Sequence, residues 1–333
     1  MPRLMQGSWA VRIGVVAAVA ASAAFLVRFA SADATPTYKP YLYLSPAATA
    51  SVQFEIRRGA SDLATYDTEI RVPGEYGARL DQPIGTVIGR VTARAVARNG
   101  LGPYTGTLSV AKPNLENGCF SMPDDEHAWN VEFSNGARSF AYQMYVDFYP
   151  GDITLLRYCL PPDAGVLESI AYTIDGVFKE PLRGTHVWRG QFYPYTTTGE
   201  IVDNDAGVSV AALVRLRHVV AFSASYASRT HRYLLRGSVT EGGVGVRHAS
   251  VALYLGAKGN DLHPFARLTT GKKGGFTYSW RSSGKDVIRF KAHARVAARV
   301  VAAPHCRKIN NTRCVSETLS SWTSDSRTIA IRP

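Results

Sequence analysis

Four cysteines stand at spacings that limit their chemistry: Cys119, Cys159, Cys306 and Cys314. None of them forms a C-x-x-C pair, so the sequence predicts neither a thioredoxin-like redox site nor a zinc knuckle. Their even number favours disulfide bonds in an exported chain, and proximity in the sequence favours the pairs Cys119–Cys159 and Cys306–Cys314. We therefore expect structural cross-links at these positions and not reactive thiols.

Basic and apolar residues alternate along the stretch 288–300. In a strand, alternate side chains point to opposite faces, so the apolar positions would be buried and the basic positions would face solvent. The basic positions are Arg289, Lys291, His293, Arg295 and Arg299, and Arg307, Lys308 and Arg313 follow in the loop that Cys306 and Cys314 enclose. The sequence thus predicts a basic stripe with a charge about every 6.6–6.8 Å, which suits a repeating anion.

Three interpretations of this stripe stay open. It could bind an anionic cell-wall polymer such as teichoic acid, an acidic polysaccharide or extracellular DNA, without specific recognition of nucleic acid. It could dock against an acidic part of the same chain. It could also be a solvated surface, which is the commonest role of a run of charges.

Aromatic side chains in the middle of the chain are the candidates for sugar binding. Trp188, Tyr193 and Tyr195 lie in or next to the segment "QFYPYTTTGE", where Pro194 indicates a loop or an edge strand. A sugar site needs a flat ring that faces solvent. Aromatic residues are also preferred within strands and in sandwich cores, and the sequence favours that role here.

Catalytic motifs are missing from the sequence. The chain has no H-E-x-x-H, no G-x-S-x-G and no phosphate-binding loop of the Walker type. The segment 203–207 begins like a calcium loop, but no bidentate acid follows it at the loop's end. We expect no catalytic residues, no cofactor and no metal site. Two carboxylates from distant strands could still meet in space, as in a hydrolase.

The N-terminus has the features of a signal peptide. Arg3 and Arg12 precede an apolar run over 14–27, and the small residues Ala32 and Ala34 follow it. The run has about 14 residues, whereas a membrane-spanning helix needs about 20. We expect residues 1–34 to be removed, so that the mature protein is secreted and has no membrane span.

Three modules of β structure are expected in the mature chain, at residues 35–113, 114–225 and 226–333. Frequent Tyr, Val and Thr, with Gly and Pro between short alternating segments, are typical of β-sandwiches. The middle range carries seven Arg and Lys against 14 Asp and Glu, whereas the last range carries 19 against five. The net charge of +12 therefore combines an acidic middle module with a basic C-terminal one.

The C-terminal range shows a pattern shared with known proteins. Residues 272–275 predict a hairpin turn between two strands. The segment "RGSVTEGGVGVRHASVALYL", followed by "TTGKKGGFTYSW", resembles the prealbumin-like modules of bacterial secreted proteins. The order of segments along the mature chain also resembles uncharacterised secreted proteins of high-GC Gram-positive bacteria. This resemblance implies export and a fold of tandem immunoglobulin-like or transthyretin-like β-sandwich modules. It implies no catalytic or ligand residues.

These features together predict a secreted, non-catalytic interaction protein of the extracellular space or cell envelope. Its expected partner is an anionic cell-wall polymer or polysaccharide, bound through the basic C-terminal module. Two alternatives remain at this point. One is a carbohydrate-binding protein that uses the aromatic residues of the middle module, and the other is an extracellular hydrolase.

Overall fold

The computed structural model describes residues 38–46, 51–95, 103–114, 127–149, 153–179, 181, 184–196, 205–257, 261–281, 286–301 and 312–333. The predicted signal peptide, the cysteines Cys119 and Cys306, and the basic residues Arg307 and Lys308 lie outside the described residues. The described part of the chain contains strands and three short 3-10 helices, at Gly74–Tyr76, Pro162–Val166 and Ser228–Thr230. The prediction of an all-β fold with sandwich-like sheets is confirmed.

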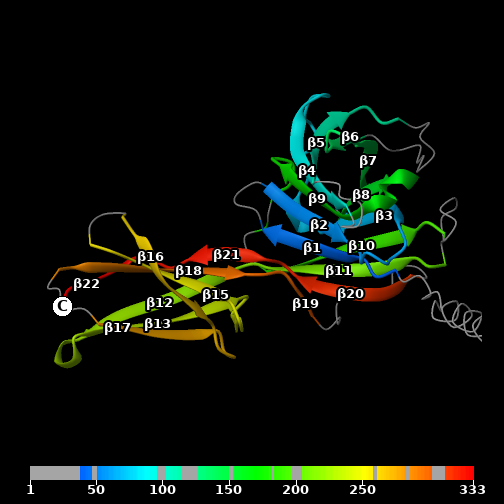
Figure 1. The fold of residues 1–333 in the computed structure, drawn as a ribbon. Helices are drawn as coiled ribbons and strands as arrows, with labels where there is room; N and C mark the ends of the chain where they lie inside the picture. The colour runs from blue at the N-terminus through cyan, green and yellow to red at the C-terminus, as the bar shows by residue number, and fades with distance from the viewer. Residues whose placement is uncertain are drawn as a thin grey trace, which may run out of the picture. The chain divides into compact units, whose positions relative to one another are not determined.

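The largest sheet contains 13 of the described strands (Figure 1). In spatial order they are β1 (Tyr41–Pro46), β2 (Ser51–Arg57), β9 (Leu167–Asp175), β4 (Val87–Ala95), β5 (Tyr104–Ala111), β6 (His127–Ser134), β7 (Ser139–Tyr149), β8 (Ile153–Cys159), β3 (Thr65–Val72), β10 (Thr185–Pro194), β11 (Val208–Arg215), β20 (Arg313–Leu319) and β19 (Arg299–Val300). Neighbouring strands are antiparallel except β11 and β20, which run parallel.

Strands from the two predicted modules at 35–113 and 114–225 interleave in this sheet. The strand β9 pairs with both β2 and β4, and β3 pairs with both β8 and β10. A single hydrophobic core contains buried residues from both predicted modules, between Tyr38 and Leu216. Residue alternation shows which face of a strand is buried but not which strand it pairs with, so this shared sheet could not be derived from local patterns.

Two smaller sheets enclose a second hydrophobic core. The four-stranded sheet contains β12 (His218–Ala227), β13 (Arg232–Glu241), β14 (Val244–Gly245) and β17 (Gly275–Arg281). The five-stranded sheet contains β16 (His263–Thr269), β15 (Ser250–Gly256), β18 (Ile288–Val296), β21 (Trp322–Asp325) and β22 (Ile329–Ile331). Tyr233 and Phe290, from opposite sheets, have ring centroids 5.2 Å apart in this core.

The predicted hairpin around residues 272–275 is wrong, because the strands on its two sides belong to different sheets. The strand β16 pairs with β15, whereas β17 pairs with β13. The rings of Phe265 and Tyr278 meet edge to face at 5.7 Å from these two sheets. The turn therefore carries the chain across the sandwich, and its two strands face each other through the core.

The two described cysteines are both disulfide-bonded. Cys159 ends β8, Cys314 lies on β20, and no free cysteine occurs in the described part of the chain. Their predicted partners, Cys119 and Cys306, lie outside the described residues, so the pairing stays a prediction. Among the described residues, no helix has the length and hydrophobicity needed to cross a bilayer.

Candidate anion-binding face and cleft

The predicted alternation of basic and apolar side chains is present in β18. Phe290, Ala292 and Ala294 are buried in the second core, with exposed fractions of 0%. Arg289, Lys291, His293 and Arg295 occupy the alternating outward positions, and none of them is buried. The strand therefore presents a row of basic side chains to solvent, because its other side fills the sandwich.

The strand β16, two strands away from β18 in the same sheet, adds a cation to this row. In the ladder, His293 pairs with Ala252 of β15, and Ala252 pairs with Arg267 of β16. Directly paired residues share a face of the sheet, so the exposed Arg267 lies on the same side as His293. We call this surface the basic face and define it by Arg267, Arg289, Lys291, His293 and Arg295.

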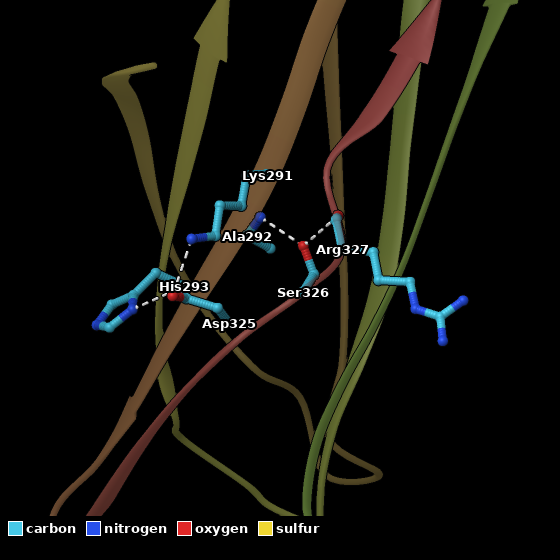
Figure 2. A network of polar contacts seen from close by, with 6 residues as sticks. All are labelled: Lys291, Ala292, His293, Asp325, Ser326 and Arg327. Carbon is cyan, nitrogen blue, oxygen red and sulfur yellow. Dashed lines mark hydrogen bonds and ion pairs between the residues drawn. The ribbon is translucent and has the colours of Figure 1, made fainter. Parts of the chain in front are cut away.

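One carboxylate, that of Asp325, moderates the charge of the basic face. Lys291 Nζ donates a hydrogen bond to Asp325 Oδ2 at 2.8 Å, and His293 Nδ1 lies 2.8 Å from Asp325 Oδ1 (Figure 2). Burial by itself would raise the pKa of Asp325, but the hydrogen bonds to Lys291 and His293 outweigh it and lower the pKa. Asp325 thus stays ionised and holds two of the basic side chains in place.

Backbone contacts place Asp325 opposite these two residues. Ala292 N donates to Ser326 Oγ at 2.9 Å, and Ser326 N donates to Ala292 O at 2.8 Å. Ser326 Oγ in turn donates to Arg327 O at 2.9 Å (Figure 2). This pattern fixes the register between β18 and the end of β21, where Asp325 pairs with His293.

Arg299 and Arg313 do not continue the basic face, contrary to the prediction. The strand β18 ends at Val296, and Arg299 lies on β19, which pairs with β20 of the large sheet. Arg299 Nη2 donates to Glu241 Oε2 at 2.5 Å, and Glu241 is 1% exposed. Arg313 is exposed on β20, also in the large sheet.

A cleft with a volume of about 640 Å³ adjoins one end of the basic face. One wall comes from β1 and β2 and includes Tyr43, Glu55 and Arg57. The other comes from β18 and β21 and includes His293, Arg295 and Thr323, with Ser45, Val296, Ala297, Ala298, Ser321 and Trp322 completing the lining. The cleft therefore combines the half-buried ring of Tyr43 with two arginines and a carboxylate.

Hydrogen bonds connect the two walls of the cleft. The hydroxyl groups of Ser45 and Ser321 lie 2.8 Å apart, and Ser321 N donates to Leu44 O at 3.2 Å. On the β2 wall, Arg57 makes two hydrogen bonds of 2.8 Å to Glu55, and its guanidinium lies 5.0 Å from the centre of the Tyr43 ring. These contacts hold the cleft residues in defined positions before any ligand arrives.

The aromatic residues predicted for sugar binding do not form a platform. Trp188 is 0% exposed and lies in the large core, where its ring meets Tyr76 edge to face at 5.1 Å. Tyr195 is buried, and its hydroxyl donates to Leu160 O at 2.8 Å. Tyr193 is half-buried beside Gln191, which donates to its hydroxyl. Trp188 and Tyr195 are therefore buried, as the strand propensity of aromatic residues favoured, and Tyr193 is only partly exposed.

Two outward-facing tyrosines that the sequence analysis did not single out lie on β1. Tyr41 and Tyr43 are half-buried and stacked, with ring centroids 6.1 Å apart and ring planes inclined by 28°. Leu42 and Leu44, between and after them, are buried. The alternation in "YLYLSP" was the signal available, since it places both tyrosines on the face opposite the core.

Titratable groups also meet on β3 and β8. Asp67 and Arg157 are both buried, and Arg157 Nη2 lies 3.5 Å from Glu69 Oε1. Burial, reinforced by the charge of Glu69, raises the pKa of Asp67 to about 7. Among the described residues, no three His, Cys, Asp or Glu side chains converge as metal ligands would. Asp67 of this cluster is buried and Glu69 is largely covered, whereas the basic face and the cleft are open to solvent.

Comparisons with known proteins do not assign a family. No protein-family profile matches the sequence, and no curated protein sequence matches it. The D0-D1 domain of intimin is 6% identical, with a TM-score of 0.20 over 86% of this chain and 98% of that one. A protein from Bacteroides uniformis described as carbohydrate binding is 11% identical, with a TM-score of 0.21 over 77% of this chain and 96% of that one. At these TM-scores the likenesses carry no argument about function.

Proposed function

We propose that this chain is a secreted, non-catalytic interaction protein that binds an anionic polymer of the extracellular space or cell envelope through its basic face. The observation that carries the proposal is the charge balance of that face. Arg267, Arg289, Lys291 and Arg295 bring four permanent cations to one side of a single sheet. Among the described residues, Asp325 is the only carboxylate that the ladder places beside them.

A linear polyanion suits this surface for a geometric reason. Outward side chains of β18 recur at a fixed spacing along the strand, and Arg267 lies two strands away across the sheet. A flexible polymer with repeated negative charges could contact several of these cations at once. Its affinity would arise from many weak contacts, each screened by salt.

Retention of the full chain on immobilised heparin tests the proposal. We expect the variant Arg267→Ser, Arg289→Ser and Lys291→Ser to elute at clearly lower salt than the unaltered protein. The matched control is Arg90→Ser, Arg94→Ser and Arg138→Ser, which removes the same charge from exposed positions on β4 and in the turn between β6 and β7. If both triple variants elute at the same salt concentration, net charge alone explains the retention and the proposal fails.

A further inference from the structure

We propose that the cleft between the β1–β2 wall and the β18–β21 wall binds one carboxylated sugar ring, of the uronic acid type, within the anionic polymer. This inference rests on the proposed function, because it selects an acidic polysaccharide from the wider class of polyanions. Three features carry it: a stacked tyrosine pair, arginines on both walls, and a carboxylate in the lining.

The tyrosines supply a surface that fits a pyranose ring. Tyr43 lines the cleft, and Tyr41 stacks beside it on the same outward side of β1. A sugar ring presents C–H groups on its faces, which pack against the electron-rich face of an aromatic ring. An inorganic polyanion such as polyphosphate has no such groups, so this part of the cleft would not contribute to its binding.

The arginines supply the partner for a sugar carboxylate. Arg295 is exposed, lines the cleft and comes from the basic face, whereas Arg57 comes from the opposite wall. The planar guanidinium of Arg295 can bind a carboxylate with two parallel hydrogen bonds. Nε and Nη2 of Arg57 already donate to Glu55, so Arg57 would reach the ligand through Nη1. Arg57 is already held by Glu55 and Tyr43, which reduces the entropy lost when a ligand is bound.

Glu55 explains why a singly charged sugar suits the cleft better than phosphate. Its carboxylate faces the same space as Arg57 and Arg295, so the three groups leave a single net positive charge. One sugar carboxylate balances that charge, whereas a multiply charged phosphate would be repelled by Glu55. The carboxylate oxygens and the hydroxyl groups of Ser45 and Thr323 also offer hydrogen bonds to sugar hydroxyls.

Binding of trigalacturonate, maltotriose and inorganic tripolyphosphate to the full chain tests this inference by calorimetry. We expect trigalacturonate to bind more tightly than either other probe at equal ionic strength. Tyr43→Ala should weaken trigalacturonate binding by about three- to tenfold and leave tripolyphosphate binding unchanged. The matched control is Tyr254→Ala, which removes a tyrosine from β15 beside the basic face but outside the cleft lining.

Each outcome separates this inference from the proposed function. A loss of trigalacturonate binding in Tyr43→Ala, but not in Tyr254→Ala, supports the cleft. Equal binding of the three probes, or equal effects of the two substitutions, overturns it even if heparin retention still depends on the basic face. Because Tyr43 is half-buried, Tyr43→Leu serves as a second variant that keeps apolar bulk and removes the flat ring. Retention of full trigalacturonate affinity in this variant also overturns the inference.

Discussion

Among single residues, Asp325 is the one whose charge opposes the cations of the basic face. It contacts Lys291 and His293 and is about half exposed, so these polar contacts contribute little stability. Its main effect is electrostatic, because it places a negative charge where the polymer would bind. The ionic contacts that order the face therefore also weaken its attraction for anions.

Replacing Asp325 by Asn should separate these two effects. We expect Asp325→Asn to bind heparin more tightly than the unaltered protein, since it removes the carboxylate among the cations. Stability should fall by about 1 kcal/mol or less at neutral pH. The folded protein lowers the pKa of Asp325, so this loss should be present above about pH 4, the unfolded value, and vanish as the pH falls through the folded pKa. Urea unfolding at pH 7 and pH 2.5 measures the difference, and weaker heparin binding would contradict the proposed role of the face.

For the individual strands, residue patterns predicted which positions are buried and which face solvent. They did not predict where the chain passes from one sheet to another. The basic side of β18 followed from alternation over Arg289, Lys291, His293 and Arg295. The same alternation continued in the sequence to Arg299, but the strand ends at Val296 and the partly exposed Arg299 pairs with the buried Glu241. The turn before β17 likewise crosses the sandwich, which depends on contacts far apart in the sequence.

The pairing of β5 with β6 leaves no room for a side chain at Gly106 of β5. A Cβ atom built on Gly106 would lie 1.8 Å from Glu132 O and 2.5 Å from Phe133 Cα, both in the backbone of β6. We expect Gly106→Ala to destabilise the protein by about 2–4 kcal/mol, because backbone and not a flexible side chain must move. Thermal unfolding measures the loss. Gly275→Ala on β17 is the control, since its nearest neighbour would be 3.9 Å away, and an equal loss there would contradict the steric argument.

Over the whole described chain, the two cores are connected by a small buried network around Glu241. Arg299 from the large sheet and Trp322 from the five-stranded sheet both donate to this carboxylate, at 2.5 Å and 3.1 Å. The ring of His218 stacks on Trp322 with a centroid distance of 4.2 Å. Sequence patterns predicted the β class and the strands but not these contacts, because residues this far apart come together through long-range strand pairing such as that of β11 with β20.

Removing the Glu241 carboxylate should show how much this network contributes. We expect Glu241→Ala to lower the free energy of unfolding by about 2–3 kcal/mol, because it leaves a guanidinium and an indole N–H without their partner. The partial exposure of Arg299 keeps the loss below that of a fully buried pair. Glu55→Ala, which breaks an exposed pair with Arg57, should cost about 1 kcal/mol or less in the same urea titration. Equal losses would mean that burial of Glu241 does not strengthen the network.

The salt dependence of heparin affinity tests the central claim most directly, because it counts the cations that contact the polymer. We expect the logarithm of the affinity to fall linearly with the logarithm of the NaCl concentration for the unaltered protein. For the variant Arg267→Ser, Arg289→Ser and Lys291→Ser the slope should be smaller by roughly two to three, whereas the control Arg90→Ser, Arg94→Ser and Arg138→Ser should keep the original slope. An unchanged slope in the first variant would contradict binding through the basic face.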